Sequence, residues 1–327
     1  MRFVPSGTCL TQTAIFMEPW HSNEGTPPGI ANRTPMRRLL TPVVLVLTAG
    51  LATASASGAP TAKVPQLIFP VVGKATYFDD FGAARGQGGH QGNDLMTTWR
   101  SPAVAAEGGK IKFHTTSARA GCMLYLYGAS GTTYIYIHLN NDLTAKNDNK
   151  GKCVAGGSYW KGLKDGARVV AGQPIGYNGN SGDADQAGYH LHFEVHPNDG
   201  AAVSPFRYLN RAKKLLVPVQ PEANFTAALR GKVVAADGVA RSLTLMVDSL
   251  QSWPGGMRVP DVKRSVQLSV PPSVVISNPL GALIASAKLA ALKKGQPAVA
   301  WTAIAPATME AALGTPLILT TERLVVG

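Results

Sequence analysis

The sequence predicts a mainly β protein in which two domains of antiparallel strands follow one another. At 327 residues, the chain is long enough for two domains. From Leu67 to about Leu209, short runs of Val, Ile, Tyr, Phe and Leu alternate with Gly, Asn and Asp, a pattern typical of strands and turns. No amphipathic helix of ordinary length interrupts this region. A segment with two prolines at 216–221 then precedes a second series of short apolar runs, so we expect a second β domain.

Residues 67–210 form the first predicted domain. Two apolar runs, 123–127 and 132–139, are joined by Gly-Ala-Ser-Gly, which predicts a β-hairpin. Residues 140–166 are polar and rich in Gly, Lys and Asn, so they predict a long surface loop. The strands expected in this domain lie at 123–127, 132–139, 169–177 and 190–195.

A linker at 211–224 leads to the second predicted domain, residues 225–327. The run 286–294 predicts one short helix, which Gly295 closes as a C-terminal cap. This domain contains no histidine or cysteine, and we expect a small β-barrel or β-sandwich that either positions the first domain or binds its partner, or else serves as a structural appendage. Its expected strands lie at 230–238, 243–247, 266–276, 297–303 and 317–326.

The N-terminal residues predict export. Within 36–56, two arginines precede an apolar stretch at 39–51 and then a run of small residues, which matches a secretory signal peptide cleaved after Ala54 or Ala56. The apolar stretch is short for a membrane span, although an N-terminal anchor is the alternative. Residues 1–35 are Pro-rich and predict a non-native extension, with Met36 as the true initiator. The mature chain would start with a linker, 57–66, and we expect it to be secreted or wall-associated, without stable membrane insertion.

Charge and cysteine content fit that compartment. Thirty-one Lys and Arg against 19 Asp and Glu give a net charge of +12, which favours anionic partners. No nucleic-acid-binding signature is present, so we expect anionic wall polymers and no nucleic acid. Removal of residues 1–56 also removes Cys9. The two remaining cysteines, Cys122 and Cys153, predict a disulfide in an oxidising compartment, and two free thiols are the alternative.

A histidine cluster carries the chemistry. Six of the seven histidines lie between 90 and 196, and His190 and His192 are two apart, so on a strand they share a face. Two imidazoles and a carboxylate form a ligand set that suits Zn²⁺ with one position open for water. Gly92 and Asn93 separate His90 from Asp94, which predicts a loop running into a strand rather than a helix. We expect the metal ligands to be the set His90, Asp94 and His192, with His138 and His190 flanking the metal as proton acceptors.

These motifs resemble those of the lysostaphin-like zinc endopeptidases, the LytM group. The resemblance rests on His-x-x-x-Asp, a Tyr/Ile-rich strand that ends in His-Leu, and the closing His-Leu-His-Phe-Glu, and it extends in order and spacing over 68–209. It implies an antiparallel sheet with a groove walled by loops, and cleavage of peptide bonds in bacterial peptidoglycan. It also implies His90, Asp94 and His192 as zinc ligands and His138 and His190 as catalytic residues.

Two segments depart from the family pattern, and several residues keep more than one interpretation. The stretch 95–102 is bulkier than expected, and the loop 140–166 is long, so both could reshape the groove. His114 and His196 match no required position, and Glu194 is either a hydrogen-bond acceptor for a ligating imidazole or a structural residue. Three tyrosines are candidates for the groove or for the core: Tyr134, Tyr136 and Tyr189.

Two other functions stay open at this point. One is a non-catalytic wall-binding or amidase-activating protein of the same fold. The other is a secreted zinc protease that acts on other proteins. The presence of all five motif residues favours a peptidoglycan endopeptidase over the first of these.

Overall fold

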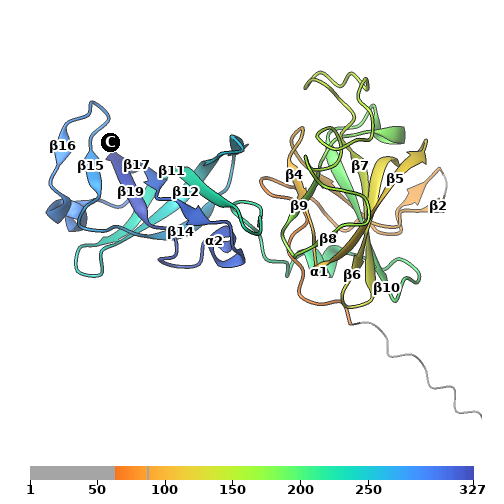
Figure 1. The fold of residues 1–327 in the computed structure, drawn as a ribbon, viewed down its shortest axis with the longest axis horizontal. Coiled ribbons are helices and arrows are strands. Elements are labelled where there is room, and N and C mark those ends of the chain that lie inside the picture. Colours follow the sequence, from red (N-terminus) through yellow and green to blue (C-terminus); the bar gives the residue numbers. More distant parts are fainter. Residues whose placement is uncertain (1–62, 87) are drawn as a thin grey trace, which may run out of the picture. The chain divides into compact units, whose positions relative to one another are not determined.

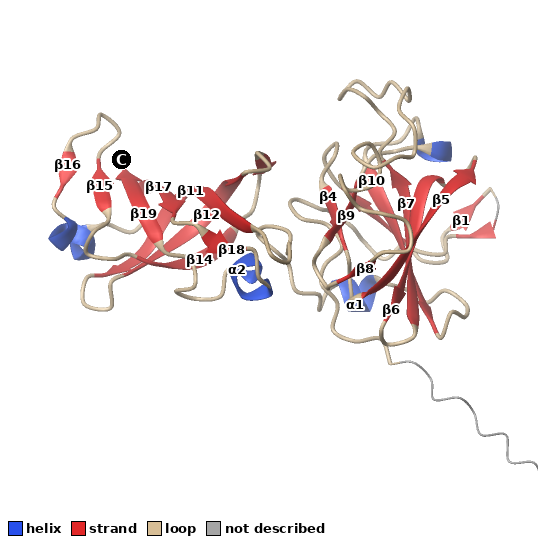
Figure 2. Cartoon of the chain, viewed as in Figure 1, coloured by secondary structure: helices blue, strands red, loops and turns tan. Residues whose placement is uncertain are grey.

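The chain is built from strands and loops, with only a few short helices (Figures 1 and 2). The computed structural model describes residues 63–327 except residue 87. The predicted N-terminal extension and signal peptide, with Cys9 and Met36, therefore lie outside the described residues, as does most of the linker 57–66. None of the helices in the described part has the length and apolar character that a membrane crossing needs.

An antiparallel six-stranded sheet forms the framework of the first half of the described chain (Figure 1). The hairpin predicted between 123 and 139 is present, because β6 and β7 pair directly. In sheet order, the strands are β3 (Asn93–Met96), β10 (His190–Pro197), β7 (Thr132–Leu139), β6 (Gly121–Gly128), β5 (Gly109–Ser117) and β8 (Arg168–Val169). Two smaller pairs accompany it: β1 (Ala84–Arg85) with β2 (Gly88–Gly89), and β4 (Pro102–Val104) with β9 (Pro174–Tyr177).

A second sheet, of nine strands, follows along the chain. All its pairings are antiparallel except that of β15 with β19. The main path is β13 (Met257–Val259), β12 (Ser242–Trp253), β11 (Asn224–Asp237), β17 (Pro297–Thr302), β19 (Thr321–Val326), β15 (Val275–Ser277) and β16 (Leu283–Ile284). Off this path, β14 (Arg264–Ser269) pairs with β12, and β18 (Ala305–Pro306) pairs with β11. The predicted mainly β, antiparallel fold class is thus confirmed, while the domain boundaries stay a prediction.

The helices differ from the sequence prediction. The helix expected at 286–294 is a 3₁₀ helix, Ser286–Ala291, that ends early. The backbone N–H of Lys293 donates to the side chain of Gln296 at 3.0 Å, so this turn draws a donor away from helix propagation. Two short α-helices were not expected, α1 (Phe206–Leu209) and α2 (Met309–Leu313). Thr308 caps the N-terminus of α2 through its side chain.

The core beneath the first sheet explains two of the three tyrosines. Tyr134 and Tyr136 are fully buried among Leu, Ile and Phe side chains. The Tyr136 hydroxyl accepts a hydrogen bond from Ala106 N and donates to Val104 O at 3.0 Å, so its polar end is satisfied inside the core. These tyrosines are core residues, and neither lines the cavity described below. A second apolar cluster is formed mainly by residues 215–326.

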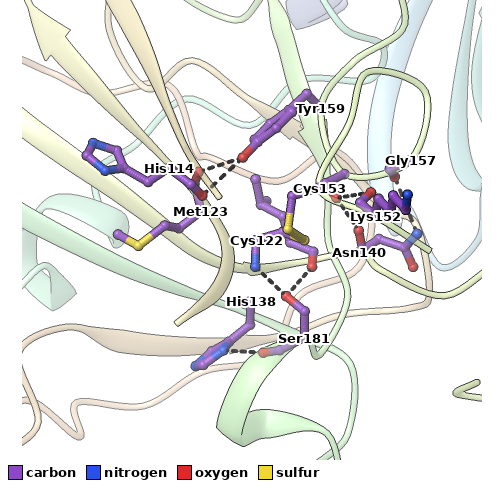
Figure 3. The surroundings of a disulfide bond; sticks show 12 residues. His114, Cys122, Met123, His138, Asn140, Lys152, Cys153, Gly157, Tyr159 and Ser181 are labelled. Atoms are coloured by element: carbon purple, nitrogen blue, oxygen red, sulfur yellow. Dashed lines mark hydrogen bonds between the residues drawn. A yellow bond between two sulfur atoms is a disulfide. The ribbon is translucent and has the colours of Figure 1, made fainter. Parts of the chain in front are cut away.

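The disulfide prediction is confirmed. Cys122 on β6 is bonded to Cys153 at an S–S distance of 2.03 Å (Figure 3). The disulfide links the loop 140–166 to the sheet. The bulky stretch 95–102 also holds this loop, through hydrogen bonds. The indole N–H of Trp99 donates to Asn140 at 2.8 Å, and the Arg100 guanidinium donates to the carbonyl of Gly156 at 2.9 Å. The two departures from the family pattern therefore form one structural unit.

Candidate metal centre

Strand register gathers the predicted ligands on one face of the first sheet. β3 and β10 run antiparallel with His192 directly opposite Asp94. On β10, Leu191 and Phe193 enter the core and are fully buried, so the alternating residues His190 and His192 point to the opposite face. His90 precedes β3 on a loop, as the glycine between it and the strand predicts.

Three ligand atoms meet at this face. His90 Nε2 lies 2.8 Å from His192 Nδ1 and 3.2 Å from Asp94 Oδ1. The third side of the triangle, between His192 Nδ1 and Asp94 Oδ1, measures 3.1 Å. His90, Asp94 and His192 are the one group of at least three potential metal-ligating side chains found among the described residues. The arrangement can hold a metal ion.

Each ligating imidazole has an acceptor for its other nitrogen. His90 Nδ1 lies 3.0 Å from the carbonyl oxygen of Asp80, and His192 Nε2 lies 2.9 Å from Glu194 Oε1. A proton on each of these outer nitrogens leaves the inner nitrogen with a free lone pair for a metal. Glu194 is therefore a hydrogen-bond acceptor for a ligand, one of the two interpretations that the sequence left open.

The charges of this cluster depend on one another. Burial raises the pKa of Asp94, but hydrogen bonds from His192 and His90 outweigh burial and hold that pKa well below its usual range. Burial likewise lowers the pKa of His192, yet the carboxylates of Asp94 and Glu194 raise it to about 9. A ligand imidazole must lose the proton on its metal-facing nitrogen before it can bind a metal, so metal affinity falls as the pH falls.

A β-bulge brings His138 to the same face. Between the register pairs Cys122–Leu139 and Leu124–Tyr136, one residue of β6 opposes two of β7. His138 lies in this bulge with φ 61°, in the left-handed region. Regular alternation would place it beside Tyr136 in the core, and the bulge turns it to the opposite face instead.

His138 and His190 face one another beside the three ligand atoms. Their ring centroids are 5.0 Å apart, and His190 Nε2 lies 3.8 Å from Asp94 Oδ1. His138 Nδ1 lies 2.8 Å from the carbonyl of Ser181, and His190 Nδ1 lies 2.8 Å from that of Gly188. A carbonyl only accepts, so each Nδ1 carries the proton and each Nε2 is left as a free acceptor. Burial, assisted by His190, lowers the pKa of His138 to about 4, so its ring is neutral near pH 7.

A comparison with protein families finds a match that spans these residues. Residues 88–205 match the model of peptidase family M23. We call this matched part of the chain, residues 88–205, the M23 domain. The family resemblance predicted from the motifs is thereby confirmed.

Solved structures show a likeness to the M23 domain. One is a candidate glycyl-glycine endopeptidase, LytM, from Ruminococcus gnavus, with 24% identity, a TM-score of 0.35 and coverage of 44% of this chain and 59% of that one. The catalytic domain of the antimicrobial peptidase lysostaphin from Staphylococcus simulans has 26% identity, a TM-score of 0.32 and coverage of 42% and 92%. This chain thus spans about three fifths of the first relative's length. No curated protein matches the chain.

A cavity of about 670 Å³ opens over the cluster of the M23 domain. It is lined by the five predicted site residues and by charged neighbours that include Arg85, Arg119 and Asp183. Neither the bulky stretch 95–102 nor the loop 140–166 lines this cavity. These two hydrogen-bonded segments therefore do not shape its wall.

The two remaining histidines of the M23 domain lie outside the ligand group. His114, on β5, packs its ring against Tyr125 with centroids 4.0 Å apart. His196 Nε2 donates to Glu194 Oε2 at 2.7 Å, so it contacts the centre only through that carboxylate. Tyr189 likewise stays outside the cavity lining, and its hydroxyl donates to Ala145 O at 3.2 Å.

Sequence reasoning missed Arg85, which lies just before the residues that match the family. Its guanidinium lies 2.9 Å from Asp94 Oδ2 and 3.2 Å from Asp80 Oδ2, so it holds the ligand carboxylate from the side away from His192. Arg85 lies on the β1–β2 hairpin, five residues before His90. The available signal was the glycine-rich segment 86–89, which predicts a turn that can bring an arginine back toward the ligand loop.

Proposed function

We propose that the M23 domain is a zinc-dependent endopeptidase that hydrolyses peptide bonds in bacterial peptidoglycan cross-links. The observation that carries this proposal is the convergence of His90 Nε2, Asp94 Oδ1 and His192 Nδ1 beside two imidazoles whose Nε2 atoms are free acceptors. Ligands and proton acceptors are the two components that metal-assisted hydrolysis needs.

The donor set fits zinc. Two neutral imidazoles and one carboxylate are the ligand types of catalytic zinc sites, which keep a further position open. Ligand atoms around tetrahedral zinc lie about 3.3 Å apart, given bonds of about 2.0–2.1 Å. The three separations here are 2.8, 3.1 and 3.2 Å, so a small expansion accommodates the ion.

Catalysis then depends on how the chain places proton acceptors. Zinc at this site would polarise the scissile carbonyl and make the attacking water more acidic. His138 and His190 present unprotonated Nε2 atoms to the cavity, so they can accept the proton of water and return it to the leaving amine. We assign these roles to the two residues jointly. Both rings are buried, so each is held in place by its surroundings.

Features outside the metal centre support peptidoglycan as the substrate and the cell exterior as the location. The family match is to a peptidase, and the charge of +12 favours an acidic polymer. The predicted signal peptide and the disulfide are both features of exported proteins. We therefore propose that the protein is secreted and acts at the cell wall.

A zymogram on purified peptidoglycan tests the proposal. We expect clearing that a chelator abolishes and that added zinc restores, and mass spectrometry of the products identifies the cleaved bond. No clearing at any zinc concentration would indicate a non-catalytic wall-binding protein. Cleavage of casein without cleavage of wall material would indicate a protease for other proteins.

Single substitutions separate ligands from proton acceptors. His192→Ala is expected to lose both bound zinc and turnover, because it removes a ligand. His138→Ala and His190→Ala are expected to keep stoichiometric zinc while turnover falls by about 10²–10⁴-fold, the usual contribution of a general base. Elemental analysis of the purified proteins measures the zinc. Stoichiometric zinc in His192→Ala would refute the ligand assignment.

A further inference from the structure

Ser181 is buried, with 1% of its surface exposed, beside the register pair at which the bulge in β7 ends. Its hydroxyl accepts a hydrogen bond from Cys122 N at 2.9 Å and donates one to Leu139 O at 2.6 Å (Figure 3). Cys122 and Leu139 are the register pair at the end of the bulge, on β6 and β7. One hydroxyl therefore joins the two strands beside the residue that the bulge reorients.

The backbone of the same serine sets the ring of His138. The Ser181 carbonyl accepts from His138 Nδ1 at 2.8 Å, and Figure 3 shows Ser181 between the Cys122 backbone and that ring. The hydroxyl fixes where the serine lies, and the carbonyl then fixes where the imidazole lies and which nitrogen carries its proton.

Packing leaves Ser181 little freedom. Gly182 follows Ser181 in the sequence and Gly121, on β6, lies against it in space, and both glycines have positive φ, 79° and 63°. A Cβ at Gly121 would collide with Ser181 Oγ, and one at Gly182 would collide with the carbonyl of Arg119. Gly121 thus makes room for the hydroxyl, and Gly182 lets the chain after Ser181 approach the backbone of Arg119.

We propose that Ser181 is a positioning residue for His138: its hydroxyl holds the β6–β7 bulge that turns this imidazole toward the metal centre. This inference rests on the proposed function through the catalytic role of His138. Asp94 lies on β3, His192 lies on β10 and His90 lies on the loop before β3. Ser181 contacts none of these elements through its hydroxyl, so it acts on the proton acceptor and not on the metal ligands.

The test compares Ser181→Ala with Ser158→Ala. Ser158 is also fully buried, and its hydroxyl donates to Asn140 O at 2.5 Å in the same domain, so it matches the loss of a buried hydrogen bond. For Ser181→Ala we expect stoichiometric zinc, a fall in kcat of at least about tenfold and KM within about twofold, since misplacement of a general base acts on the chemical step. Ser158→Ala is expected to keep kcat. Equal kcat values in the two variants would overturn the proposal.

A double substitution shows whether Ser181 acts through His138. In the His138→Ala background, adding Ser181→Ala is expected to change kcat by less than about twofold, because residues that act as one unit are not additive. A further fall of about tenfold would show that Ser181 works by another route, and would overturn the positioning role.

Nitrogen NMR of the histidine rings measures which ring nitrogen carries the proton, in the wild-type protein and in Ser181→Ala. We expect His138 to carry its proton on Nδ1, and Ser181→Ala to show a mixture of tautomers. A wild-type ring protonated on Nε2 would overturn the inference even if Ser181→Ala fails to fold. Because this readout needs no turnover, it also separates failure of the positioning role from failure of the proposed endopeptidase activity.

Discussion

At the scale of single residues, the direction of the nitrogen that carries no proton distinguishes a candidate metal ligand from a proton acceptor. His90 and His192 give their outer nitrogens to Asp80 and Glu194, and their inner nitrogens meet at the candidate metal position. His138 gives its Nδ1 to a carbonyl and keeps a free Nε2 over the cavity. The hydrogen bond fixes which nitrogen carries the proton, and the direction of the other nitrogen then decides the role that we assign to the histidine.

Glu194→Gln tests the support of a ligand from outside the centre. The amide keeps the shape but not the charge that holds the proton on His192 Nε2, so we expect zinc affinity to fall by about 10–100-fold. Competition with a chromophoric chelator measures this affinity. Glu107→Gln is a matched control, because Glu107 accepts hydrogen bonds from Tyr134 and Ser130 far from the ligands. Equal affinities in the two variants would contradict the assigned role.

The neutral His138 makes the stability of the metal-free protein depend on pH. Its pKa is lowered to about 4 in the folded chain, mainly by burial, while an unfolded histidine titrates near about 6.5. The unfolded state therefore binds more protons below about pH 6.5, and stability is lost as the pH falls from there toward about 4.

His138→Asn removes this titration and keeps a side chain that tolerates positive φ. Between about pH 7.5 and 4.5, we expect the unfolding free energy of the wild type to drop by about 2–3 kcal/mol more than that of the variant. Urea titrations of both proteins in chelator measure the difference. Parallel pH profiles would show that His138 is not held neutral.

At the scale of elements, strand alternation was predictable from the sequence and the bulge was not. The spacing of His190, His192 and Glu194 places all three on one face, and the structure agrees. The same rule applied to β7 would bury His138 with Tyr134 and Tyr136. The motif resemblance placed His138 at the metal, and the structure supplies the reason, a bulge that no local residue pattern announces.

Contacts between distant segments account for what the sequence could not supply. Arg85 reaches Asp94, 9 residues further along the chain, through a hairpin, whereas Ser181 reaches Cys122 and Leu139, which are 59 and 42 residues away. Local periodicity carries no information on such contacts. The helix expected at 286–294 failed for a local reason, since a side-chain acceptor competes for Lys293 N at its end.

The disulfide is expected to stabilise the loop 140–166 through the unfolded state. Cys122 and Cys153 are 31 residues apart, and closing a loop of that length restricts the unfolded chain by about 3–4 kcal/mol. The double variant Cys122→Ser/Cys153→Ser should lose about that much unfolding free energy in urea titrations. The wild-type protein with its disulfide reduced should lose a similar amount of unfolding free energy. An unchanged midpoint in both would mean that the contacts of Trp99 and Arg100 hold the loop on their own.

At the scale of the whole molecule, the candidate catalytic residues lie in and beside the first sheet, whereas positively charged residues occur in both halves of the described chain. The second sheet, from β11 to β19, has no histidine or cysteine and lies outside the family match. Lysines line a cavity on this second half, at Lys288, Lys293 and Lys294, without an acidic side chain among the lining residues. Under the proposed function, the first half would hydrolyse the wall polymer and the lysines of the second half would attract it.

Salt should separate attraction from hydrolysis. A protein of net charge +12 is attracted to an anionic wall mainly through exposed groups, and such attraction weakens as the Debye length falls from about 10 Å at 0.1 M to about 3 Å at 1 M salt. We expect retention on purified walls to fall severalfold over this range. The buried centre is screened much less, so kcat on a short soluble cross-link peptide should change by less than about twofold. Sedimentation with walls and peptide turnover measure the two quantities on the same preparation. Retention that does not respond to salt would mean that the wall is held by uncharged contacts, and that the basic composition serves no binding role.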